Sequence, residues 1–272
     1  MTQTGYAELN DTTFYYEVAG EGHPLVLLHG GLVDRRLWDD QFAVFAQHYK
    51  VIRFDMRGFG DSGLVKRDTK PYSQRQDLYA LLQFLSIEKT YLIGLSMGGG
   101  LAIDFTLEHP EMVDALITVG AGLSGFEFED KDNPLWVEAQ DAFAKHDIPR
   151  AVDVTLKVWT IGPSRSAEQV DAAVLERVRA MTTRNFHRSD DEDAPEPLEL
   201  ESPAIARLSE IHVPTLIIVG DQDVREILII GDTLEKGIAG AKKVVIPGTA
   251  HHLNMEKPGE FNQAVLDFLS GV

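Results

Sequence analysis

The sequence contains no cysteine and no long hydrophobic run. Without cysteine, the chain has no disulfide bonds, no thiolate metal ligands and no cysteine nucleophile. The longest apolar runs, such as residues 25–28 and 215–219, are far shorter than the ~20 residues needed to span a bilayer. The first ten residues lack the basic segment followed by an apolar segment that marks a secretory signal. We therefore expect a cytoplasmic protein.

Basic residues are few relative to acidic ones. The chain has 25 Lys and Arg against 43 Asp and Glu, which gives a formal net charge of −18. Because such a charge repels nucleic acids and anionic lipid surfaces, we expect neither as a partner. Part of the acidity lies in residues 189–201, a proline-broken run that is typical of a solvated linker.

Short apolar runs alternate with stretches in which apolar residues recur every three or four positions. The short runs predict strands and the longer stretches predict helices. Strands are expected at 14–18, 25–28, 51–54, 91–95, 115–119, 215–219 and 243–246, and helices at 75–85, 227–238 and 258–269. This alternation predicts an α/β fold, with a mostly parallel sheet that is covered by helices on both faces.

The region between residues 120 and 215 interrupts this alternation, because it contains helical patterns and no convincing strand. The helices are expected at 136–145, 148–159 and 167–181. Parallel strands are usually joined by crossovers of about a dozen residues, so this longer connection predicts an inserted helical cap. We expect residues 1–122 and 202–272 to form the core, and residues 123–201 to form the cap with its acidic linker.

A Gly-x-Ser-x-Gly motif, Gly94 to Gly98, lies between an expected strand and an expected helix. A sharp turn between such elements holds its central residue in a strained backbone conformation, with the side chain projecting outward. At that point the hydroxyl of Ser96 also lies beside the N-terminus of the following helix, which favours developing negative charge. The motif therefore predicts that Ser96 is a nucleophile.

A serine nucleophile requires a base and a group that orients the base. His251 follows the expected strand 243–246, and Asp223 follows the expected strand 215–219. Open α/β sheets place their sites at such carboxyl strand ends, and the chain order Ser, Asp, His is the one expected for this motif. We predict that His251 is the base and Asp223 its partner, with His252 as a second candidate for the base and Asp221 more suited to turning the chain.

The negative charge that develops on the substrate oxygen requires two hydrogen-bond donors. One is expected to be the backbone N–H of Met97, the residue after the nucleophile. The other is expected from the loop after residues 25–28, with Gly31 as the first choice and Leu32 as the second. His29, in the same loop, is expected to anchor the loop.

Nothing in the sequence indicates a cofactor or a metal ion. Residues 58–63 match Gly-x-Gly-x-x-Gly, but the polar, proline-broken segment 66–71 follows where a dinucleotide-binding motif would have a helix. The pattern His-Glu-x-x-His is absent, and two adjacent histidines on a regular element do not face one ion. In the cap, the aromatic residues Trp136, Phe143 and Trp159 are expected to wall the substrate pocket.

Five blocks of this sequence, in this order, resemble the α/β-hydrolase superfamily. The blocks are His29-Gly30-Gly31, Asp55-Met56-Arg57-Gly58-Phe59-Gly60-Asp61-Ser62, Gly94-Leu95-Ser96-Met97-Gly98-Gly99, Gly220-Asp221-Gln222-Asp223, and Ala250-His251 with Glu256-Lys257-Pro258. The resemblance implies the same roles for Ser96, Asp223 and His251. The sequence around Ser96 is similar to that of carboxylesterases and of 3-oxoadipate enol-lactonase-like hydrolases. The Asp nucleophile of dehalogenases and epoxide hydrolases is absent, which disfavours those activities.

The leading hypothesis is a cofactor-independent serine hydrolase that cleaves a small carboxylic ester or lactone through an acyl-enzyme on Ser96. One alternative is a Ser-His lyase or carbon–carbon bond hydrolase on the same fold, and another is a non-enzymatic small-molecule receptor. The net charge disfavours anionic substrates at long range, although three cap arginines, Arg165, Arg184 and Arg188, would reverse this locally if they faced the pocket.

Overall fold

The computed structural model describes residues 2–127, 134–188 and 194–272. These residues contain an eight-stranded sheet with the order β1-β2-β4-β3-β5-β6-β7-β8. The strands are β1 (Gln3–Leu9), β2 (Thr12–Ala19), β3 (Pro24–Leu28), β4 (Lys50–Phe54), β5 (Thr90–Leu95), β6 (Val113–Val119), β7 (Thr215–Gly220) and β8 (Lys242–Ile246). The pairs β1–β2 and β2–β4 are antiparallel, and the remaining pairs are parallel. The predicted α/β fold with a mostly parallel sheet is confirmed.

Side chains of the central strands alternate between two apolar cores, one on each face of the sheet. On one face, helices α2 (Gln74–Phe84), α3 (Met97–Glu108) and α7 (Arg225–Gly237) cover the sheet. On the other face, α1 (Asp39–Phe45), the short helix α8 (Leu253–Glu256) and α9 (Pro258–Leu269) cover it. All six residues of β5 and of β7 are buried, which explains why these strands read as continuous apolar runs.

Strand β1 was not anticipated from the sequence. It pairs with β2 through a tight hairpin in which Asn10 and Asp11 have φ values of 50° and 60°, the conformation that a two-residue hairpin turn favours. Ala7 is the one buried residue of this edge strand. Because only one residue of β1 is buried, the strand needs no apolar run that a sequence pattern would reveal. Its formation depends instead on the hairpin turn and on pairing with β2.

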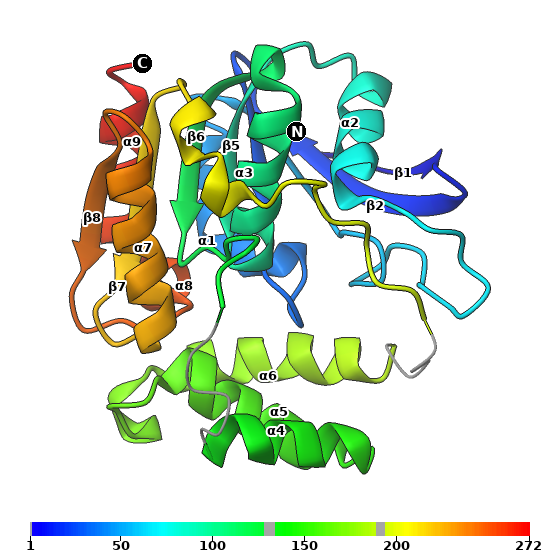
Figure 1. Cartoon of the computed structure of the whole chain (residues 1–272), viewed down its shortest axis with the longest axis vertical. Coiled ribbons are helices and arrows are strands. Elements are labelled where there is room, and N and C mark those ends of the chain that lie inside the picture. The colour runs from blue at the N-terminus through cyan, green and yellow to red at the C-terminus, as the bar shows by residue number, and fades with distance from the viewer. Residues whose placement is uncertain (1, 128–133, 189–193) are drawn as a thin grey trace.

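Between β6 and β7, helices α4 (Pro134–Ala144), α5 (Ile148–Thr155) and α6 (Ala172–Phe186) form a layer across the carboxyl ends of the strands (Figure 1). The expected helix 148–159 is two elements, because α5 passes into wider π-helical turns at Leu156–Ile161. The expected helix 167–181 is also divided: a single 3-10 turn precedes α6, which begins after the capping carboxylate of Asp171 and continues to Phe186. No helix in the described ranges is long and apolar enough to cross a membrane.

Candidate active site

Ser96 occupies a strained turn between β5 and α3. Its φ and ψ angles are 55° and −116°, in a region that non-glycine residues rarely adopt. Surrounding hydrogen bonds hold this conformation: Ser96 N donates to Val119 O at 2.9 Å, and Ser96 O accepts from Gly100 N at 3.0 Å and Gly122 N at 2.9 Å. The expected strand-to-helix turn is therefore confirmed.

The glycines of the motif allow the backbone to pack closely around this turn. A Cβ atom at Gly94 would lie 2.1 Å from Gly98 O, and one at Gly98 would lie 2.5 Å from His29 O. Any side chain at either position would separate α3 from β5 or from the loop after β3. Close packing therefore requires glycine at these two positions of the motif, and this packing places the N-terminus of α3 beside that loop.

His251 and Asp223 form a buried pair at the carboxyl ends of β7 and β8. The Nδ1 atom of His251 lies 2.7 Å from Oδ2 of Asp223, and both residues are 3% exposed. Because Nδ1 donates to the carboxylate, Nε2 is the nitrogen that is able to accept a proton. This Nε2 atom is buried and has no hydrogen-bond partner in the described part of the chain. The pair is therefore arranged as a base with its orienting carboxylate.

Gly120, directly after β6, makes room for this pair. Its φ is 48°, and a Cβ atom there would lie 3.1 Å from Nδ1 of His251 and 3.3 Å from Oδ2 of Asp223. Sequence reasoning missed this residue. The available signal was a glycine at the carboxyl end of a strand that borders the strand carrying the nucleophile.

His252 lies in a different environment from His251. Its Nδ1 atom is 3.1 Å from the Thr160 hydroxyl, and burial, together with the neighbouring His251, lowers its pKa to about 3. His252 is therefore neutral near pH 7. Asp221 is likewise occupied, because its Oδ1 accepts a hydrogen bond from Gly248 N at 2.6 Å and shapes the loop before His251. These contacts favour His251 and Asp223 over their neighbours.

The loop after β3 brings Gly31 and Leu32 to the same pocket as Met97. His29 anchors this loop, as expected. Its Nε2 accepts from Met56 N at 2.9 Å, so the other nitrogen, Nδ1, carries the proton and donates to Gly30 O at 2.7 Å. Burial lowers the pKa of His29, which keeps the ring neutral.

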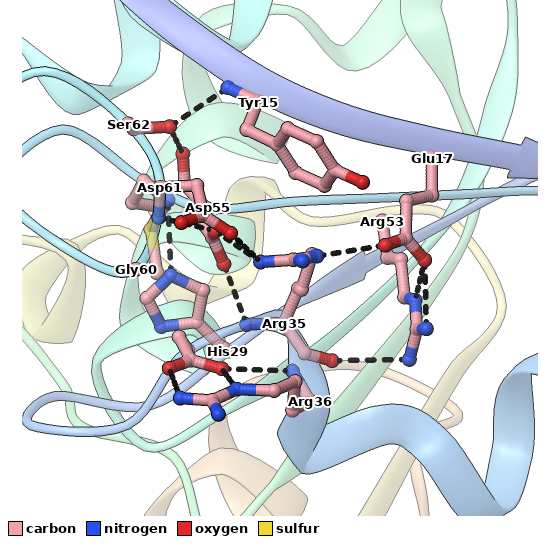
Figure 2. A network of polar contacts seen from close by, with 12 residues as sticks. Tyr15, Glu17, His29, Arg35, Arg36, Arg53, Asp55, Gly60, Asp61 and Ser62 are labelled. Atoms are coloured by element: carbon pink, nitrogen blue, oxygen red, sulfur yellow. Dashed lines mark hydrogen bonds and ion pairs between the residues drawn. The ribbon is translucent and has the colours of Figure 1, made fainter. Parts of the chain in front are cut away.

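A network of charged groups surrounds Arg35, which directly follows this loop (Figure 2). Asp55, at the end of β4, accepts hydrogen bonds from Arg35 N at 2.8 Å and from Arg35 Nη1 at 2.6 Å. The same guanidinium binds Asp61 at 2.9 Å and Glu17 at 2.9 Å. The Gly-rich segment 58–63 therefore forms a turn around a buried ion network. Arg57, directly before this segment, pairs with Asp77 at 2.7 Å.

Ser96 and His251 line one pocket of about 150 Å³. Its other described lining residues are Gly30, Gly31, Leu32, Val33, Leu95, Met97, Thr155, Trp159, Thr182 and His252. Two larger hollows lie beside the β1–β2 turn and contain none of Ser96, Asp223 and His251.

Of the three aromatic residues expected to wall this pocket, Trp159 does so, and its ring lies 4.5 Å from that of His251. The expectation for Phe143 is corrected. Phe143 is 43% exposed, packs against Phe186 with ring centroids 4.6 Å apart, and is not among the described lining residues. The side chain of Trp136 lies outside the described part of the structure. Thr155 and Thr182 were missed, because buried threonines on amphipathic helices carry no distinguishing sequence signal.

None of the three cap arginines is among the described lining residues of the pocket. Arg165 is paired with Glu256 at 2.6 Å, and Arg184 is paired with Asp61. Arg188 donates to Ser62 O at 2.5 Å. Their charges are therefore used to attach the cap to the core.

The fold is that of an α/β hydrolase, and the comparison with known proteins agrees. A family model described as alpha/beta hydrolase fold matches residues 23–258. The chain belongs to this family, which is a family of hydrolases.

The similar proteins include hydrolases with different substrates. A 2-hydroxy-6-oxo-6-phenylhexa-2,4-dienoate hydrolase from Comamonas testosteroni is 27% identical over 269 residues, which cover 96% of this chain and 93% of that protein. The enol-lactonase from Burkholderia xenovorans LB400 superposes with a TM-score of 0.80 at 25% identity, covering 98% of this chain and all of the other. Est816, an N-acyl homoserine lactone degrading enzyme, superposes with a TM-score of 0.76 at 26% identity, covering 97% of this chain and all of the other.

Proposed function

We propose that this protein cleaves a small neutral carboxylic ester or lactone through an acyl-enzyme on Ser96. The observation that carries the proposal is the 2.7 Å contact between His251 and Asp223, beside a pocket that also contains Ser96. A serine hydroxyl is a weak nucleophile, and a neutral imidazole held by a buried carboxylate is the group that activates it.

In the first half of the reaction, the Ser96 hydroxyl oxygen attacks the carbonyl carbon while Nε2 of His251 takes the hydroxyl proton. The carbonyl electron pair moves onto the oxygen. When it returns, the bond to the leaving oxygen breaks, and His251 gives its proton to that oxygen. Asp223 keeps the other proton on Nδ1 and stabilises the imidazolium. Water then attacks the acyl-enzyme by the same route and restores Ser96.

The backbone N–H groups of Met97 and Gly31, with Leu32 as the alternative to Gly31, are the proposed donors to the developing oxyanion. All three residues line the pocket. Because Met97 begins α3, the partial positive charge at the N-terminus of that helix acts on the same oxygen.

The size and charge of the pocket support a small neutral substrate. A cavity of about 150 Å³ is comparable to one that accommodates a benzene molecule. The described lining contains no Lys or Arg to bind a carboxylate, and the net charge of −18 repels anions at long range. The similarity to an enol-lactonase and to an N-acyl homoserine lactone degrading enzyme supports an ester or lactone bond as the target.

A second candidate is the hydrolysis of a carbon–carbon bond. It is favoured by the similarity to the dienoate hydrolase from Comamonas testosteroni. A dienoate carries a carboxylate, and the absence of Lys and Arg from the described lining of the pocket ranks this candidate second.

Labelling with a fluorophosphonate tests the proposal, since this reagent adds only to activated serines. We expect peptide mass mapping to find the label on Ser96 alone, and we expect Ser96→Ala to prevent labelling and to lower turnover of p-nitrophenyl esters by several orders of magnitude. Ser62 is a matched comparison, because it is a serine beside another Gly-rich turn, and its hydroxyl donates to Asp55 O. Label on Ser62, or no label, would contradict the proposal.

A further inference from the structure

Helix α6 places an unused hydroxyl group at the candidate active site. Thr182 is fully buried and lines the same pocket as Ser96 and His251. Its Oγ1 atom has no hydrogen-bond partner in the described part of the chain. A buried hydroxyl without a partner costs free energy that the isosteric valine would not cost.

Two other threonines on helices of this protein, one buried and one half-buried, satisfy their hydroxyls locally. Thr106 donates to Ala102 O at 2.7 Å, and Thr233 donates to Ile229 O at 2.8 Å, each to the carbonyl four residues earlier. Thr182 lies within α6, and Val178 is the residue four positions earlier. The Thr182 hydroxyl nevertheless makes no hydrogen bond to the carbonyl of Val178. Its hydroxyl is therefore without a partner in the described part of the chain, on a residue that lines the pocket.

The position of Thr182 relative to the loop after β3 is fixed by the next turn of α6. Asn185, which is 1% exposed, accepts from Gly60 N at 3.0 Å and donates to Leu32 O at 3.2 Å. Arg184 is paired with Asp61 on the core. These contacts hold Thr182 at a fixed place in the pocket that Met97 and Leu32 also line.

We propose that the Thr182 hydroxyl is a substrate-binding group, which hydrogen-bonds to a second polar group of the substrate. This inference rests on the proposed function and narrows the substrate to an ester or lactone that carries a hydroxyl, keto or amide group near the scissile carbonyl. The remaining lining is largely apolar, so such a group finds few other partners there. A site that hydrogen-bonds to the substrate also rejects an apolar isostere of that substrate, because the protein's hydroxyl stays unpaired when the isostere binds.

Two pairs of isosteric esters test the inference on the wild-type enzyme and on Thr182→Val. Methyl 3-hydroxybutyrate and methyl 3-methylbutyrate differ in the acyl part, while 2-hydroxyethyl butyrate and propyl butyrate differ in the alcohol part. The quantity compared is the ratio of kcat/KM for the hydroxylated ester to kcat/KM for its apolar isostere. In at least one pair, this ratio is expected to be about three- to tenfold lower in Thr182→Val than in the wild type, which corresponds to the loss of one neutral hydrogen bond. Thr182→Ser, which keeps the hydroxyl, is expected to retain the preference.

Thr118→Val is the matched control, because Thr118 on β6 is also fully buried with an unpartnered Oγ1 but does not line the pocket. It is expected to leave the preference unchanged, and neither valine variant is expected to lower Tm, since no hydrogen bond within the protein is lost. An unchanged preference in both pairs with Thr182→Val, or a fall in its Tm without a change in preference, would overturn the inference while leaving the proposed function intact. A wild-type enzyme that cleaves none of these esters or the p-nitrophenyl esters would overturn both.

Discussion

The buried neutral His252 makes the stability of this protein depend on pH in a defined way. Burial, with a smaller contribution from His251, lowers its pKa from 6.5 to about 3. Between these values the unfolded chain binds a proton that the folded chain does not bind. The stabilisation is therefore complete above pH 6.5 and is lost as the pH falls towards 3. At pH 5 this one group lowers the free energy of unfolding by about 2 kcal/mol relative to pH 7.

The variant His252→Asn removes the titrating ring and keeps an amide that is able to hydrogen-bond to Thr160. Thermal unfolding of the wild type and the variant should be compared between pH 7.5 and 4.5. We expect the wild-type Tm to fall by about 4–8 °C more than the variant Tm between pH 7 and 5, the change that corresponds to about 2 kcal/mol for a chain of this size. His212→Asn, at an exposed position, is the control and should behave like the wild type.

Parallel pH profiles for the wild type and His252→Asn would refute the argument that His252 is held neutral by burial. The same variant separates the two candidate bases. His252→Asn should retain turnover within about tenfold, whereas His251→Asn should lose it, because only His251 pairs with a carboxylate. If His252→Asn abolished turnover and His251→Asn retained it, the assignment of the base would be reversed.

Three further predictions concern the site. Asp223→Asn should keep the fold and lower kcat by about 10⁴, the effect of losing control of the histidine tautomer, while Asp221→Asn should lower it less than tenfold; a larger loss in the second variant at equal Tm would reverse this assignment. Gly120→Ala should lower both Tm and kcat because its Cβ would lie 3.1 Å from Nδ1 of His251, whereas Gly240→Ala, with φ of 78° and nothing within 4 Å, should lower Tm alone; equal kcat values would contradict the role of Gly120. Neutral esters should have a higher kcat/KM than matched carboxylate-bearing esters at low salt, and this gap should narrow as salt rises; a preference for the charged ester that weakens with salt would point to a cationic site instead.

Much of the core could be predicted because its strands and turns are specified locally. The strands β3, β5 and β7 are continuous apolar runs, since parallel strands buried on both faces need apolar residues at every position. The turn at Ser96 is recognisable for a similar reason, because the close approach of backbone at Gly94 and Gly98 admits no side chain. The edge strand β1 had no such signal, since one of its residues is buried and its pairing with β2 determines it.

The cap shows where local patterns are insufficient. An apolar residue on a cap helix faces either a neighbouring helix or the pocket, and both satisfy the same periodicity. Phe143 packs on Phe186, whereas Trp159 lies against His251, and only the docking of the cap on the core distinguishes them.

The chemical identity of the site and its geometry have different origins. Residue types and their order along the chain were sufficient to select Ser96, Asp223 and His251 as candidates, because a strained turn and two carboxyl strand ends are features of local sequence. The tertiary structure decided which of two adjacent histidines meets a carboxylate. It also decided that the cap arginines bind the core and that Thr182, whose hydroxyl has no partner among the described residues, lines the pocket. These outcomes depend on contacts between segments distant in the chain, and burial and pairing there set the charge and hydrogen-bonding of each group.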